Sequence, residues 1–124
     1  MRGKLVLNSS QILTILMLFP LDSFSGLTCE KLAGFLHVSP CHLSRSFRSP
    51  DTGTLEKALQ KIRVLRAAIA FSDIPDLSVK DVAVKVGYED SKYFSRLFKE
   101  ILGIYPSDYK CFIEACRNAV NPQC

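Results

Sequence analysis

The stretch from Val82 to Lys99 limits the fold of this 124-residue chain more than any other segment. Small apolar residues lead up to Gly87, which can adopt the left-handed backbone that ends a helix, and Asp90 is a favoured N-cap for the next one. Beyond Asp90, apolar residues recur at three- and four-residue spacing: Phe94, Leu97, Phe98 and Ile101. The pattern predicts two helices joined by a tight turn, the second with one side in a core.

The other side of this second helix is predicted to be polar and basic. Its residues recur at the same spacing: Lys92, Ser95, Arg96 and Lys99. A short scaffold helix, a tight turn and a second helix with an exposed basic side are typical of a helix-turn-helix. In that motif the second helix presents its side chains to the bases of DNA.

A similar pattern occurs about fifty residues earlier. Residues 32–33 match residues 82–83 fifty positions later, and residues 43–48 match residues 94–99 fifty-one positions later. The second copy therefore has one additional residue in its turn. Two copies of an outward basic helix favour a repetitive linear polymer as the partner.

In the first copy, Ser39 is predicted to cap a helix with Pro40 in its first turn, where the missing N–H is not needed. Leu43 and Phe47 then point inward. The outward residues are Cys41, Ser44, Arg45 and Arg48.

Between the copies, one continuous helix of roughly eighteen residues is predicted, about 27 Å long at the α-helical rise. Its apolar positions are Leu55, Leu59, Ile62, Leu65 and Ile69. A rod of that length can hold two helix-turn-helix units apart by nearly one turn of duplex, ~34 Å. Pro75 ends it, and Ser78 with Asp81 predicts a capping box for the next helix.

The expected fold is all-α, two helix-turn-helix subdomains joined by a long linker helix, in a homeodomain-like arrangement. It divides into an N-terminal helix and connector (1–27), a first helix-turn-helix (28–53), the linker helix (54–72) and a second helix-turn-helix with a C-terminal helix (78–120). Pro106 is expected to open that last helix, with Tyr109, Phe112 and Ile113 covering the core. Tyr88, Tyr93 and Phe94 are also expected in the core, because they have core spacing.

The N-terminal stretch has two readings. A basic start followed by apolar residues imitates a signal peptide, but polar residues 8–11 interrupt it and no small-x-small cleavage pattern follows. The favoured reading is a helix capped by Ser9 or Ser10 and ended by Pro20. Its inward residues would be Ile12, Ile15, Leu16 and Phe19.

Composition narrows the class of protein. The hydrophobic content of 48% excludes general disorder, and no apolar run reaches the ~18 to 20 residues that cross a bilayer. Sixteen Lys and Arg against twelve Asp and Glu give a net charge of +4, which permits a nucleic-acid partner. Five cysteines, an odd number without a Cys-x-x-Cys pair, favour a reduced intracellular protein and argue against a disulfide framework or a zinc site.

From about Thr28 to Tyr109 the chain resembles the AraC/XylS DNA-binding domain. The resemblance rests on Ala33, Val38-Ser39-Pro40, Leu43-Ser44-Arg45, Phe47, Ile62-Arg63, Ala67, Ala83, Val86-Gly87-Tyr88, Asp90, Tyr93-Phe94-Ser95-Arg96, Phe98-Lys99, Gly103, Pro106-Ser107 and Tyr109. It implies two helix-turn-helix subdomains bound along one face of DNA. It also implies base contacts from Cys41, Ser44, Arg45, Ser91, Lys92, Ser95 and Arg96. The chain departs from the family at His37, where Gly is common, so the backbone there must avoid or tolerate a positive φ.

Two kinds of DNA contact are expected. Arg45 and Arg96 occupy equivalent positions beside a phenylalanine, and an arginine can bond guanine O6 and N7 together. Arg48 and Lys99 are expected to contact phosphates, which gives affinity without sequence preference.

The expected function is sequence-specific DNA binding in transcription regulation, by two recognition helices inserted into successive major-groove segments, and not catalysis. Double-stranded DNA is the expected partner and RNA polymerase a candidate second one, in the cytoplasm with the nucleoid, with no membrane and no cofactor. The sensor or dimerisation domain usual in the family is expected to be missing. Two alternatives stay open: a helical protein-interaction module, and an alkyl-DNA transferase using Cys41, because Pro40-Cys41-His42 resembles the start of an alkylguanine-DNA methyltransferase motif.

Overall fold

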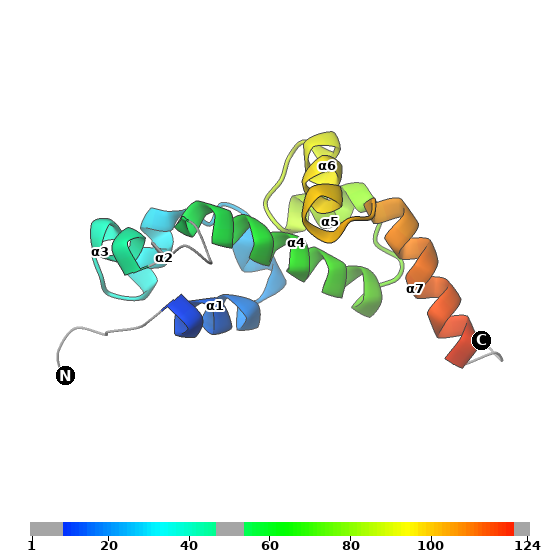
Figure 1. Cartoon of the computed structure of the whole chain (residues 1–124), viewed down its shortest axis with the longest axis horizontal. Coiled ribbons are helices and arrows are strands. Elements are labelled where there is room, and N and C mark those ends of the chain that lie inside the picture. The colour runs from blue at the N-terminus through cyan, green and yellow to red at the C-terminus, as the bar shows by residue number, and fades with distance from the viewer. Residues whose placement is uncertain (1–8, 47–53, 121–124) are drawn as a thin grey trace.

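The computed structural model describes residues 9–46 and 54–120, and within these ranges the regular structure is helical throughout. Figure 1 shows the order of the elements along the chain. They are α1 (Ser9–Leu18), the 3₁₀ helix η1 (Leu21–Phe24), α2 (Cys29–Phe35), α3 (Pro40–Ser46), α4 (Leu55–Asp73), α5 (Val79–Lys85), α6 (Ser91–Leu102) and α7 (Pro106–Val120). The all-α prediction is confirmed. None of these described helices has the length and apolar character needed to span a membrane.

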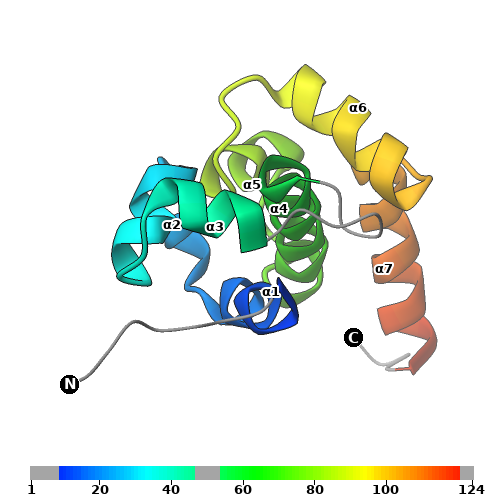
Figure 2. The ribbon, with the colours of Figure 1, turned by 60° about the vertical axis from the view of Figure 1, so that its left-hand side comes forward.

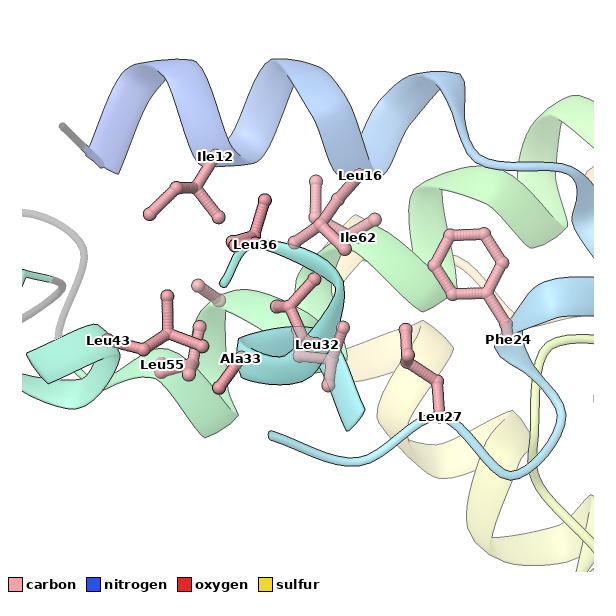
Figure 3. Packing of buried hydrophobic residues seen from close by; sticks show 12 residues of the cluster. Ile12, Leu16, Phe24, Leu27, Leu32, Ala33, Leu36, Leu43, Leu55 and Ile62 are labelled. Atoms are coloured by element: carbon pink, nitrogen blue, oxygen red, sulfur yellow. The ribbon is translucent and has the colours of Figure 1, made fainter. Parts of the chain in front are cut away.

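Two separate hydrophobic cores lie along α4, one near each end. The first joins α1, η1, α2 and α3 to the first half of α4 through Ile12, Leu16, Phe24, Leu27, Leu32, Ala33, Leu36, Leu43, Leu55, Ala58, Leu59 and Ile62. The second joins α5 and α6 to the other half through Val64, Ala67, Ala68, Ala70, Phe71, Val82, Ala83, Val86, Phe94, Leu97 and Phe98. Figure 3 shows the first core, with Ile12 and Leu16 of α1 pointing toward Leu36 and Ile62.

The two halves of α4 bury nearly opposite sides of the helix. Leu65 and Ile69, predicted to continue the apolar stripe of the first half, are 37% and 42% exposed. This part of the prediction is wrong because the second core packs against the other side of the helix, through Val64, Ala68 and Phe71. In Figure 1, α1 accordingly lies on one side of α4, and α5 and α6 on the other.

The helix ends follow local sequence signals. Thr28 and Thr54 cap α2 and α4 by accepting from the third residue beyond them. Ser78 and Asp81 form the predicted capping box of α5, and Gly103 ends α6 with φ of 80°.

The terminal helices are partly as expected. The helix predicted after Ser9 is α1, and Ile12 and Leu16 are buried. Pro106 does open α7, but Phe112 is 58% exposed rather than in the core. Tyr109 does pack on the second core, against Phe71 of α4 and Phe98 of α6. Ile113 is half-buried, whereas Phe112 lies away from the core-facing side of the helix.

Candidate nucleic-acid interface

The same turn is built twice, once between α2 and α3 and once between α5 and α6. The amide of Val38 donates to the carbonyl of Ala33 at 3.1 Å, and the amide of Tyr88 donates to Ala83 at 2.8 Å. The residue before each donor is left-handed, with φ of 58° at His37 and 102° at Gly87. His37 therefore tolerates the positive φ that glycine usually takes there. The second turn is longer by one residue before the next cap, as the repeat predicts.

In the first unit, α3 begins at Pro40, and the Ser39 hydroxyl accepts from the amide of His42 at 3.1 Å. Leu43 anchors the helix in the first core. Cys41, Ser44 and Arg45 are exposed, as expected. A shallow groove of 320 Å³ runs along this end of α3 and is lined by His37, Val38, Ser39, Cys41, His42 and Arg45. Phe47 and Arg48 lie outside the described residues.

In the second unit, Asp90 caps α6 by accepting from the amides of Lys92 and Tyr93. Phe94, Leu97 and Phe98 are buried, so the opposite side of α6 faces outward. Lys92, Arg96 and Lys99 are exposed, and Ser91 and Ser95 are half-buried beside them.

Lys99 has contacts within its own unit. Its Nζ donates to the carbonyl of Gly103 at 3.0 Å and lies 5.4 Å from the centre of the Tyr105 ring. The ammonium group thus stabilises the C-terminal end of α6, and a phosphate would have to compete with these contacts.

Arg45 and Arg96 occupy equivalent positions, each the sixth residue of its helix and each exposed. The same register pairs Cys41 with Lys92 and Ser44 with Ser95. In Figure 2 both helices are seen lengthwise, with α3 close to horizontal and α6 sloping down across the upper right.

Tyr93 was expected in the core but is 41% exposed. It lies on the flank of α6, packs on Tyr88 with the ring centres 5.8 Å apart, and its hydroxyl lies 3.5 Å from Nε2 of Gln60 on α4. Tyr88 is half-buried and Phe94 is fully buried.

Several cations stabilise the fold by donating to backbone, a role that their spacing in the sequence does not predict. Arg63 and Arg66 of α4, and Lys110 and Arg117 of α7, all donate to backbone carbonyl groups. Lys110 reaches Leu77 at 2.8 Å, and Arg117 reaches Ser72 at 2.5 Å. The sequence does contain one indication that Arg63 is buried, because it lies between two core residues, Ile62 and Val64.

The cysteines of the described ranges, Cys29, Cys41, Cys111 and Cys116, are free thiols. Burial, followed by the charge of Glu56, raises the pKa of the Cys29 thiol. The same ranges hold no cluster of three His, Cys, Asp or Glu residues that could bind a metal ion.

Comparison with known proteins identifies relatives of this helical region. A family model described as a helix-turn-helix domain matches residues 32–110. The MmsAB operon regulatory protein of Pseudomonas aeruginosa is 34% identical over 84 residues, which cover 68% of this chain and 27% of that protein. The bifunctional transcriptional activator/DNA repair enzyme AdaA of Bacillus subtilis is also 34% identical over 84 residues, covering 68% of this chain and 39% of AdaA. The chain thus spans less than half the length of either relative.

Solved structures share the fold. A DNA-binding transcriptional dual regulator from Escherichia coli K-12 has a TM-score of 0.71 and 25% identity, covering 92% of this chain and 99% of that one. The DNA-binding domain of AdpA, solved in complex with a target DNA, has a TM-score of 0.61 and 26% identity, covering 90% and 97%. On the family match, the repeated turn and the shared fold, the chain belongs to the AraC-type helix-turn-helix family of DNA-binding transcription regulators.

Proposed function

We propose that the chain binds a specific sequence of double-stranded DNA by inserting α3 and α6 into successive segments of the major groove. The observation that carries the proposal is the equivalence of Arg45 and Arg96, exposed at the same position of two recognition helices. The two units flank α4, whose 19 residues extend about 28 Å at 1.5 Å per residue. That length approaches one turn of duplex, ~34 Å, so the units can meet one face of DNA.

Base contacts are assigned to both helices. Each arginine can donate two hydrogen bonds to one guanine, which discriminates against another base by about 1–3 kcal/mol. The paired residues beside them extend the readout: Cys41, Ser44, Ser91, Lys92 and Ser95. Cys41 would contact a thymine methyl, since it is small and exposed on α3.

Phosphate contacts are assigned to Arg48 and Lys99. They add affinity that falls with salt and position the helices without reading sequence. Engagement of both units on one face requires a bent duplex or an adjustment in the spacer, and bending costs of order 1 to 6 kcal/mol. The second unit's contacts must offset that cost.

We further propose that this chain acts without enzyme chemistry. A nucleophilic cysteine needs a base or cation that lowers its pKa, oriented by an acid. The groove at Cys41 is lined by histidines and Arg45 but by no carboxylate. As a transcription regulator the chain would act in the cytoplasm, on RNA polymerase as the second partner.

The test is selection of duplexes from a random pool, followed by binding assays of Arg45→Ala and Arg96→Ala. Each variant controls for the other, because each should relax base preference in only one half of the selected site. Unchanged affinity and preference in both variants would show that the assigned surface is wrong. A helical module for acidic proteins would instead bind every duplex alike, with no preference surviving as salt is raised. Alkyl transfer to Cys41 is tested by mass measurement after incubation with alkylated DNA.

A further inference from the structure

Arg63 is the most buried charged side chain in the described part of the molecule, 9% exposed at the middle of α4. It lies where the first core ends, at Ile62, and the second begins, at Val64. Its Nη1 donates to the carbonyl groups of Phe24 at 2.9 Å and Val86 at 2.8 Å, and its Nη2 donates to Leu27 at 2.6 Å. Burial lowers the pKa of this guanidinium.

The three carbonyl groups belong to different halves of the molecule. Phe24 ends η1 and Leu27 precedes the cap of α2, so both lie in the connector that leads into the first unit, and both are part of the first core. Val86 is the C-cap of α5 and starts the turn that leads to α6. One planar guanidinium therefore ties the entry to the first helix-turn-helix to the turn of the second. A cation at the C-terminal end of α5 is also favoured by the helix dipole, whose negative end lies there.

Gly87 makes this arrangement possible. A Cβ at Gly87 would lie 1.8 Å from Nη1 of Arg63 and 2.7 Å from the carbonyl oxygen of Phe24. The backbone of the second turn thus packs directly on the guanidinium. Any relative movement of the two units at this point would break at least one of the three hydrogen bonds.

Arg66, one turn further along α4, offers a matched comparison. Its Nη1 donates to the carbonyl groups of Met17 and Phe19, both in the N-terminal segment, and the guanidinium lies over the Phe24 ring. It therefore attaches α1 to α4 with the same chemistry. Within the described residues it makes no hydrogen bond to α5, α6 or their turn, whereas the hydrogen bonds of Arg63 reach both sides.

We propose that Arg63 fixes the position of α3 relative to α6, and so determines which spacing between two DNA half-sites the chain accepts. The proposal rests on the proposed function, because it concerns two units that read one duplex. It makes Arg63 a positioning residue that sets specificity from a buried site. One base pair of added spacing turns the second half-site by roughly 35° and moves it by about 3.4 Å, so a fixed pair of helices should discriminate against it.

The experiment uses duplexes derived from the sequence that the wild-type chain selects. One set keeps both half-sites and changes their spacing by one base pair in either direction, and another keeps only one half-site. Dissociation constants are measured at one salt concentration for the wild type, Arg63→Met, Arg63→Lys and the control Arg66→Met. Circular dichroism of each variant establishes whether it is folded.

For the wild type we expect altered spacing to weaken binding by about tenfold or more, the size of a lost base contact. The measured quantity is the ratio of the dissociation constant at altered spacing to that at the selected spacing. In Arg63→Met this spacing ratio should fall to about threefold or less, while the affinity for a single half-site stays within about twofold of wild type. Arg63→Lys should be intermediate, because a single ammonium cannot match the planar fork of donors. Arg66→Met should keep the wild-type ratio.

The outcomes separate the two hypotheses. If the Arg63 variants keep the wild-type spacing ratio, the positioning role is refuted and the two-unit function is not. The same holds if they lose affinity equally for every duplex, including the single half-site. If Arg63→Met does not fold, the ratio for Arg63→Lys decides. A wild-type chain that is indifferent to spacing, or that selects only one half-site, refutes the two-unit function and this inference with it.

Discussion

Substituting Gly87 by alanine tests the contact on which the arrangement of the two units depends. Its backbone has a φ of 102°, and an added Cβ would lie 1.8 Å from Arg63 Nη1 and 2.7 Å from the Phe24 carbonyl oxygen. The second contact is with backbone and cannot be relieved by rotation of a side chain. The first contact would displace the guanidinium from its position between Phe24 and Val86.

The expected loss can be worked from these contacts. A left-handed conformation costs an alanine about 1–2 kcal/mol, and two hydrogen bonds from Nη1 contribute about 1 kcal/mol each or more because the donor is charged. Gly87→Ala should thus lower the free energy of unfolding by about 3–5 kcal/mol, a large part of the roughly 5–15 kcal/mol of a typical domain.

Urea unfolding followed by circular dichroism measures this loss. Gly103→Ala is the control, because Gly103 has a φ of 80° but, in residues 9–46 and 54–120, nothing beyond its chain neighbours lies within 4 Å of the added Cβ. Gly103→Ala should lower the free energy of unfolding only by the cost of a left-handed alanine, about 1–2 kcal/mol. In an Arg63→Met background, Gly87→Ala should cost less than in the wild type. Equal losses for Gly87→Ala and Gly103→Ala would refute the reasoning.

Three further changes test single features of the two turns. His37→Gly should stabilise the chain by about 0.5–1 kcal/mol in urea unfolding, because it removes a left-handed histidine; a loss would contradict this. Asp90→Ala should cost about 1 kcal/mol in the same assay, since it removes the cap of two α6 amides, and an unchanged midpoint would count against that role. Tyr88→Phe should be neutral or slightly stabilising, because its buried hydroxyl has no hydrogen-bond partner in the part of the chain that the structure describes. Burial also raises the pKa of Tyr88, so the wild type should lose stability as pH rises above the ordinary value of 10.0, and the phenylalanine variant should lose less.

Local signals predicted most of the helix ends. Ser39, Ser78 and Asp90 act as caps, and Gly87 and Gly103 end helices, because these effects involve residues within four positions. The repeat also predicted the second, longer turn. Which residues of the recognition helices face outward followed from the inward position of Leu43 and Phe94.

Local signals do not predict how segments far apart in the sequence pack together. Leu65 and Ile69 continue the apolar spacing of α4, but nothing local indicates that the second core lies on the other side of the helix. Tyr93 and Phe112 have the spacing of core residues but lie at the exposed sides of their helices. Their exposure depends on which other elements pack against those helices, and the local sequence does not determine this. The partners of Arg63 are 23 to 39 residues away and are backbone carbonyl groups, which any residue type can provide.

The division into two cores bears on how the chain unfolds. Among the described residues, one core contains twelve buried residues between Ile12 and Ile62, and the other contains eleven between Val64 and Phe98. Each therefore comes from about fifty residues of chain or fewer, a size at which a separate domain is only marginally stable. α4 and the Arg63 hydrogen bonds join them, so we expect the wild type to unfold in one cooperative transition. Hydrogen exchange measured in mild urea should then show a common opening free energy for the slowest amides of α2 and α5. In Arg63→Met the two values should separate, and wild-type values that already differ would show that α4 and Arg63 do not couple the cores.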